Sequence, residues 1–115
     1  MTDLIALRDA VRVFALERDW DQFHSPKNLA SALAVEAAEL LEPFQWLTDE
    51  QSRALPRNVA EDVRMEMADV LIYLIRLADK LDVDLLQAAR DKIAANAKKY
   101  PPDKARGSAR KYTEL

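Results

Sequence analysis

The stretch SPKNLASALAVEAAELLEPFQW, residues 25–46, decides the fold because it reads as a long helix whose apolar face carries acids. Leu29, Leu33 and Leu40 recur at helical spacing, and at about 100° per residue Glu36 falls among them, with Glu39 on the border of that face. A carboxylate on a buried face is costly unless a partner compensates its charge. The stretch therefore predicts a core helix whose acids need a partner.

The composition predicts an all-α fold. The chain has 115 residues, of which 50% are hydrophobic and only one is Gly, and Ala and Leu dominate. These residue types favour helices over strands, and the length fits one domain whose core is completed by helix packing or by association of protomers. Periodicity and end signals predict helices over 3–19, 26–46, 58–81 and from 82 or 84 to 100, with a short connecting helix over 48–55.

Local signals fix several of these boundaries. Ser25 is expected to cap the second helix with Pro26 in its first position, and Thr48 and Gln51 have the spacing of a capping box. Two prolines after Tyr100 are expected to end the last helix. We therefore predict a helical domain over residues 1–100 and an extended basic C-terminal arm over 101–115, for which a disordered solubilising tail is the alternative.

Composition also excludes several classes of protein. No apolar run approaches the roughly 20 residues that span a bilayer, and the first residues carry acids where a signal peptide carries basic side chains, so we expect a cytoplasmic protein with no membrane partner. The absence of Cys excludes disulfides, zinc–thiolate sites and thiol nucleophiles. The net charge of −3 argues against binding to nucleic acid polymers.

A second pair of acids repeats the pattern of the first. In EMADV, residues 66–70, Glu66 lies within the apolar face of its helix and Asp69 at the edge. Two such helices packed antiparallel would bring four carboxylates together, and a divalent cation would relieve their repulsion. Oxygen ligands suit Mg²⁺ or Mn²⁺, whereas di-iron bundles need Glu-x-x-His pairs. The alternative is a solvated face whose acids form ion pairs within the helix, and Glu42 is expected to point away from both pairs.

With these residues placed, the sequence resembles the MazG-like, all-α nucleoside triphosphate pyrophosphohydrolases. Their signature, Glu-x-x-Glu followed at a distance by Glu-x-x-Asp, matches Glu36, Glu39, Glu66 and Asp69. The resemblance covers nearly the whole chain, because FALERDWDQFHSPKNLA, EAAELLEPFQW, EMADVLIYLIRLA and SARKYTEL are similar to the dCTP pyrophosphatase branch.

That resemblance implies a fold, an assembly and a reaction. The fold would be a four-helix MazG-like bundle with a short connecting helix, assembled as a homotetramer that is a dimer of dimers. The reaction would be hydrolysis of a deoxynucleoside triphosphate, dCTP or 5-modified dCTP, to the monophosphate and pyrophosphate. Mg²⁺, with Mn²⁺ as a substitute, would be held by Glu36, Glu39, Glu66 and Asp69.

The resemblance also implies roles for individual residues. Glu36 or Glu39 would orient or deprotonate the attacking water, and Trp20 and Trp46 would help enclose the base. Taken alone, a Trp at a helix end is more typical of a core or an interface. The remaining substrate-binding residues would be Asp21, Gln22, Phe23 and His24 at the base edge, Tyr73 near the sugar, and Lys92, Asn96 and Tyr100 at phosphate or sugar.

Other interpretations stay open at this point. The polar stripe formed by Lys92, Asn96 and Tyr100 is also typical of a solvated helix face. Animal relatives have a substrate-contacting His where this chain has Val11, so the same chemistry on dUTP or another nucleotide is a second hypothesis. A third is a non-catalytic helical oligomerisation or regulatory module in which the acids form only salt bridges.

Overall fold

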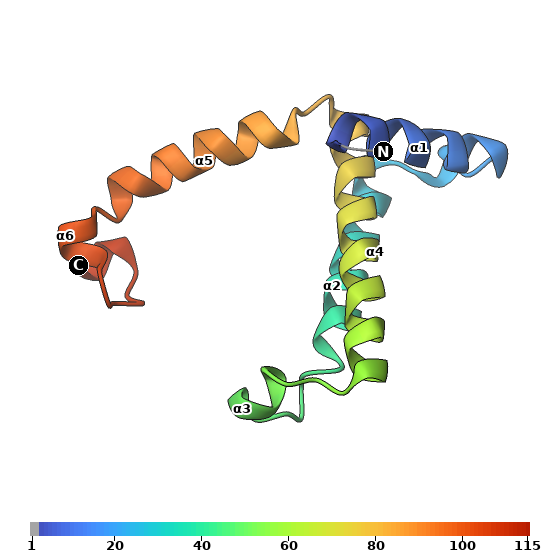
Figure 1. Cartoon of the computed structure of the whole chain (residues 1–115). Helices are drawn as coiled ribbons and strands as arrows, with labels where there is room; N and C mark the ends of the chain where they lie inside the picture. Colours follow the sequence, from blue (N-terminus) through green and yellow to red (C-terminus); the bar gives the residue numbers. More distant parts are fainter. Residues whose placement is uncertain (1–2) are drawn as a thin grey trace. The chain divides into compact units, whose positions relative to one another are not determined.

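The structure is a computed structural model that describes residues 3–115, and every regular element in that range is helical (Figure 1). This confirms the all-α prediction. Within that range no helix combines the length and apolarity needed to cross a membrane. The long helices are α1 (Leu4–Glu17), α2 (Pro26–Leu41), α4 (Arg57–Leu81) and α5 (Leu85–Lys99), and the short ones are η1 (Asp21–Phe23), α3 (Asp49–Ser52), α6 (Pro102–Ala105) and η2 (Tyr112–Glu114).

The predicted helix starts are confirmed by their hydrogen bonds. The Ser25 hydroxyl accepts from the backbone N–H of Asn28 at 3.1 Å, and Pro26 occupies the first turn of α2. At α3 the Thr48 hydroxyl accepts from the Gln51 backbone N–H, while the Gln51 side chain accepts from the Thr48 N–H. These reciprocal bonds satisfy backbone donors that the first helical turn leaves free.

Helix α2 ends earlier than predicted, at Leu41 rather than near Trp46. Pro43 has no N–H to continue the helical ladder, so the chain turns instead. The backbone N–H of Phe44 bonds the Leu41 carbonyl at 2.9 Å, and that of Leu47 bonds the Phe44 carbonyl at 2.9 Å. Trp46 therefore sits on a turn, where it is 87% exposed.

The chain divides into two compact units, the first ending at Asp82 and the second running from Val83 to Leu115. Asp82 caps α4 in the left-handed backbone region, with φ of 56°. The predicted domain boundary between residues 100 and 101 stays a prediction. The segment beyond it differs from the fully extended arm that we expected, because it contains α6 and η2. Proline fits the first turn of a helix, and Pro102 begins α6.

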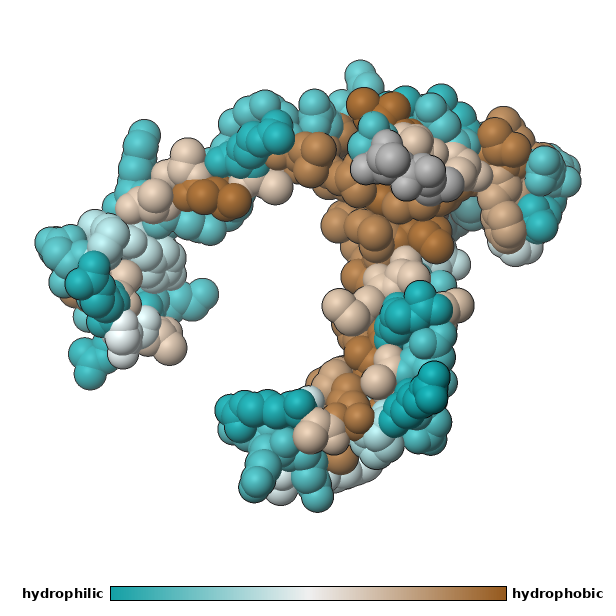
Figure 2. Space-filling view, viewed as in Figure 1, coloured by the Kyte–Doolittle hydropathy of each residue, from teal (hydrophilic) through white to brown (hydrophobic). Residues whose placement is uncertain are grey.

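The core of the first unit lies where α2 and α1 pack against α4 (Figure 1). Its buried hydrophobic residues come from all three helices, so packing fixes both α1 and α2 against α4. Many larger apolar side chains of this unit remain exposed, and Figure 2 shows hydrophobic side chains gathered over its surface. The buried set is Ala15, Leu29, Val63, Ile75 and Ala78.

Truncation of Leu29 tests whether this small core holds α2 in place. Leu29 is 1% exposed, and we expect Leu29→Ala to lower the free energy of unfolding by about 2–5 kcal/mol because it leaves a cavity. Exposed Lys27 on the same helix provides the control, and Lys27→Ala should stay within about 0.5 kcal/mol of the parent. Denaturant unfolding measures both, and equal effects would contradict this account of the core.

Candidate active site

The packing of α2 against α4 brings acids from the two helices together. Glu36 and Glu39 are three positions apart in the sequence and therefore lie on the same side of α2, and Glu66 approaches them from α4. One carboxylate oxygen from each of these three residues lies within 4.8 Å of the others. We call Glu36, Glu39 and Glu66 the acid cluster.

Electrostatic repulsion and burial act together on the acid cluster. Burial is the largest cause that raises the pKa of Glu36, to about 7, and hydrogen bonding and repulsion from Glu39 add to it. The pKa of Glu66 is also raised, first by burial and then by repulsion from Glu39 and Asp69. The protein alone therefore disfavours the fully charged form of the acid cluster.

The acid cluster has the features of a cation site. The Oε2 atoms of Glu36 and Glu66 are buried, and neither has a hydrogen-bond partner among the described residues. Buried polar atoms nearly always have a partner, and a cation would supply one for both carboxylate oxygens. Because every donor in the acid cluster is a carboxylate oxygen, the set fits a hard divalent cation such as Mg²⁺.

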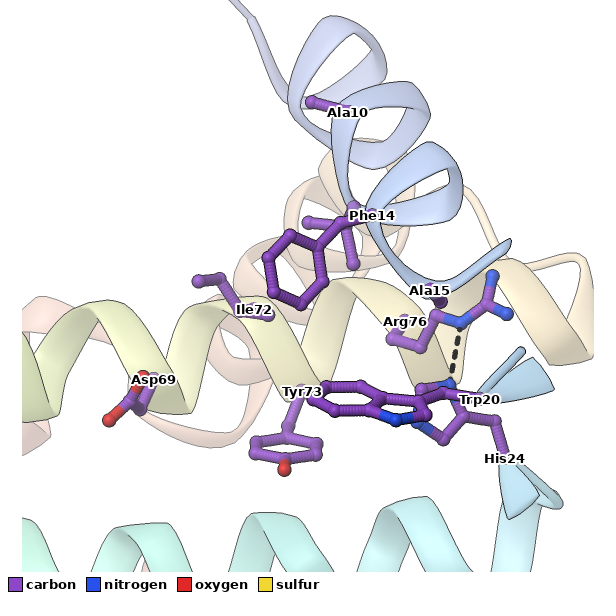
Figure 3. A pocket seen from close by; sticks show the side chains of 10 residues that line it. Ala10, Phe14, Ala15, Trp20, His24, Asp69, Ile72, Tyr73 and Arg76 are labelled. Carbon is purple, nitrogen blue, oxygen red and sulfur yellow. Dashed lines mark hydrogen bonds between the residues drawn. The ribbon is translucent and has the colours of Figure 1, made fainter. Parts of the chain in front are cut away.

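Asp69, the fourth predicted ligand, lies one turn beyond Glu66 on α4. It is exposed and stands outside the group of three, although its charge contributes to the raised pKa of Glu36. Its side chain lines a cavity of about 410 Å³, together with Tyr73 (Figure 3). Asp69 therefore connects the acid cluster to this cavity.

The cavity has an apolar wall and a polar end. Helix α1 supplies apolar side chains, among them Phe14, whose ring makes an edge-on contact with Trp20 at a centroid distance of 5.7 Å. The Arg18 guanidinium covers the Phe14 ring at 3.6 Å, which helps to fix both aromatic rings. The cavity is lined by Ala10, Val11, Phe14 and Ala15 from α1, Trp20 and His24 from the connection to α2, and Asp69, Ile72, Tyr73 and Arg76 from α4.

The predicted base segment, residues 20–24, divides into two groups. Trp20 and His24 line the cavity, as Figure 3 shows. Asp21 is held in an ion pair with Arg76 at 2.6 Å, and Lys80 also donates to it. Gln22 and Phe23 do not line the cavity: the Gln22 amide donates to the Asp19 carbonyl at 3.0 Å, and Phe23 is 61% exposed.

The other predicted substrate contacts lie outside this cavity. Trp46 stands on the turn after α2 and does not line it. Lys92, Asn96 and Tyr100 belong to the second unit, on α5 and its C-cap, and Lys92 and Asn96 are exposed. Their roles stay predictions.

Sequence reasoning missed three features of the site. Phe14 was given no role at the site, and Arg76 was overlooked although it interrupts the apolar run VLIYLIRLA, residues 70–78. Glu42 was expected to point away from the other acids, but its backbone is still helical, with φ of −50° and ψ of −46°, and it lies one turn beyond Glu39. Instead Glu42 lines a second cavity, of about 470 Å³, with Glu39, Pro43, Val59, Asp62, Met65 and Glu66.

Comparison with known proteins gives a consistent result. The model of the MazG-like family matches residues 32–115. Proteins named dCTP pyrophosphatase 1 are similar to this chain: that of Homo sapiens is 50% identical over 105 residues and that of Mus musculus 48% over 104. Each match covers 89% of this chain and 61% of the relative, so the chain spans about three fifths of the length of these relatives.

A solved structure supports the same relationship. The crystal structure of a pyrophosphatase from Archaeoglobus fulgidus is similar to this one with a TM-score of 0.77. The two sequences are 39% identical, and the match covers 81% of this chain and 87% of the other.

The raised pKa of Glu36 predicts how stability depends on pH. Between the ordinary carboxyl range and about pH 7, the native chain keeps a proton that the unfolded chain has released, so raising the pH favours unfolding. In EDTA we expect the melting temperature to fall from about pH 5 to about pH 8, and Glu36→Gln to reduce this fall. Glu61, whose pKa Arg64 lowers, is the matched control on α4.

Thermal unfolding of the parent, Glu36→Gln and Glu61→Gln proteins at several pH values tests this. The control should follow the parent over that range, because the proton on Glu61 is lost at lower pH. A Glu36→Gln protein with the same pH dependence as the parent would show that Glu36 titrates normally.

Proposed function

Because this chain belongs to the MazG-like family, we propose that it hydrolyses a deoxynucleoside triphosphate to the monophosphate and pyrophosphate. The proposed substrate is dCTP or 5-modified dCTP, and the proposed cofactor is Mg²⁺, with Mn²⁺ as a substitute. The observation that carries this proposal is the pair of buried, unpartnered oxygens on Glu36 and Glu66, which stand on different helices beside Glu39. The relatives named dCTP pyrophosphatase support the choice of nucleotide.

In this proposal the cation would be held by Glu36, Glu39, Glu66 and Asp69. When bound, Mg²⁺ would offset the charge on the triphosphate oxygens. Glu36 or Glu39 would orient the attacking water and take its proton as the water oxygen bonds to the α-phosphorus. The bond from the α-phosphorus to the bridging oxygen would then break, and pyrophosphate would leave with that oxygen.

The cavity beside Asp69 would receive the nucleoside. Stacking of the base on an aromatic ring is worth about 1–3 kcal/mol, and Trp20 offers such a ring. Tyr73 lies on the same face of α4, one turn beyond Asp69, where its bulk would exclude a 2′-hydroxyl and favour deoxynucleotides. Stacking tolerates any base, so selectivity would come from polar groups at the segment Trp20 to His24, with His24 on the cavity wall.

The remaining contacts would require assembly of the protein. We expect Trp46 to enclose the base, and Lys92, Asn96 and Tyr100 to reach phosphate or sugar, within the homotetramer that the family resemblance implies. Exposed apolar residues on α4 favour association, because a surface of this kind is normally covered by more protein. They include Met65, Met67, Leu71 and Leu74.

A nucleotide panel tests the proposed reaction. We expect pyrophosphate release from dCTP and its 5-modified forms in Mg²⁺ and none in EDTA. Glu36→Gln and Glu66→Gln should each lower kcat by at least about 100-fold. The control Glu61→Gln removes an exposed acid from α4, the helix that carries Glu66, and should leave kcat within about twofold of the parent.

Two other results would change the interpretation. Release from dUTP or another nucleotide alone would keep the acid cluster and reject the proposed base. No release from any nucleotide would reject the reaction and favour the non-catalytic helical module.

Cation binding can be measured without turnover. A ligand that binds only the native chain stabilises it by RT ln(1 + [L]/Kd), which is about 2.7 kcal/mol when its concentration is 100 times Kd. We therefore expect Mg²⁺ to raise the melting temperature of the parent and of Glu61→Gln, and to have little effect on Glu66→Gln. An equal rise in all three proteins would place the cation elsewhere.

A further inference from the structure

Arg76 is a buried charged residue at the polar end of the cavity. Its side chain is 4% exposed, and its guanidinium makes contacts in three directions. It donates to the Asp21 carboxylate at 2.6 Å, to the Asp79 carboxylate at 3.4 Å and, through Nε, to Nδ1 of His24 at 3.1 Å. Figure 3 shows this last bond reaching from α4 to the His24 ring.

The bond between Arg76 and His24 fixes the state of the imidazole. A guanidinium only donates hydrogen bonds and stays charged inside proteins, so Nδ1 of His24 must be the acceptor. A neutral imidazole with an accepting Nδ1 carries its proton on Nε2. His24 therefore presents an Nε2–H donor on a ring that lines the cavity.

The surrounding charges favour the same neutral form. Burial is the largest cause that lowers the pKa of His24, and the positive charges of Arg76 and Lys80 lower it further, against the opposite effect of Asp21. A doubly protonated ring would also lose the acceptor that Arg76 uses, and would place two N–H groups face to face.

We propose that Arg76 is a positioning residue that holds His24 as its Nε2–H tautomer, so that the cavity offers one fixed hydrogen-bond donor to the base. This inference rests on the proposed function and gives it a source of selectivity. Cytosine has an acceptor at N3, whereas uracil and thymine carry a proton there. With uracil or thymine, the Nε2–H of His24 would meet the N3–H of the base, and both donors would stay unpaired. An unpaired buried donor costs binding energy, so the site would discriminate against these bases.

Both carboxylates that pair with Arg76, those of Asp21 and Asp79, also pair with a second basic residue, so replacing Arg76 leaves neither without a partner. Asp21 keeps its bond from Lys80, and Asp79 keeps its paired bonds from Arg12. Met has a stem of similar length, so Arg76→Met should fold. Arg12→Met is the matched control, because it removes an arginine from the same network and leaves the bond between Arg76 and His24 in place.

Nitrogen NMR of the imidazole tests the tautomer directly, and His24 is the only histidine in the sequence, so its signals need no further assignment. In the parent and in Arg12→Met at neutral pH, we expect a protonated Nε2 and an unprotonated Nδ1. In Arg76→Met we expect a mixture of tautomers or a ring that takes up its second proton at higher pH. A protonated Nδ1 in the parent, or an Arg76→Met spectrum identical to that of the parent, would overturn the proposal.

Kinetics on dCTP and dUTP test the consequence for the base. We expect Arg76→Met to raise KM for dCTP about tenfold with little change in kcat, because a tenfold change corresponds to about 1.4 kcal/mol, the value of one hydrogen bond. The ratio of kcat/KM for dCTP to that for dUTP should fall by a similar factor. His24→Gln keeps an N–H donor that needs no tautomer, so Arg76→Met in that background should cost no more than about twofold.

An equal loss in both backgrounds would make Arg76 a structural residue and overturn its positioning role. The proposed reaction and the role of Arg76 can be rejected independently of each other. If no nucleotide is hydrolysed, the proposed function fails, while the NMR result still decides whether Arg76 fixes the ring.

Discussion

The repulsion among carboxylates at the contact between α2 and α4 is the constraint on which the first unit depends. The contact that buries Leu29, Val63 and Ile75 also holds Glu36 and Glu66 with unpartnered buried oxygens. Apolar burial therefore stabilises the contact between α2 and α4, whereas the buried carboxylates destabilise the same contact. The packing of these helices therefore brings the acids together without a cation, and in the proposed function this arrangement would bind the cation with little rearrangement.

Two stretches of α4 differ in how their charges are paired. Near the middle of the helix, Glu66 lies beside other acids and has no ion pair among the described residues, whereas near its C-terminal end Arg76 and Asp79 each have a neighbour of opposite charge. With a rise of about 1.5 Å per residue, Glu66 and Arg76 are about 15 Å apart along the helix. Between them Asp69 and Tyr73 line the cavity. In the proposed function, one face of α4 would therefore run from the cation and phosphates to the base.

Sequence periodicity placed Glu36 and Glu39 on one side of their helix and Glu66 within the apolar face of another, and the structure brings these three acids together because both helices are regular there. It also placed the helices and the caps at Ser25 and Thr48, since these depend on neighbours within a few residues. It failed at Glu42, which follows Glu39 by one turn and lines a cavity with Glu39 and Glu66.

Contacts between distant residues explain the other omissions. Arg76 bonds to His24, which is 52 positions away in the sequence, and to Asp21, which is 55 positions away. A pattern within a few neighbouring residues cannot predict such contacts. A charged residue within the apolar run 70–78 was nevertheless a usable signal, because a buried guanidinium must find acceptors somewhere in the fold.

The exposure of Trp46 links the proposed site to the proposed assembly. A Trp that is 87% exposed gains little from packing within its own chain, and it lies on the turn that directly follows the acid-bearing helix. Trp20, by contrast, lines the cavity and contacts Phe14 edge-on within its own chain. If the base is enclosed by both rings and Trp46 comes from a second protomer, nucleotide binding and association favour each other, because a ligand that contacts two protomers stabilises their complex.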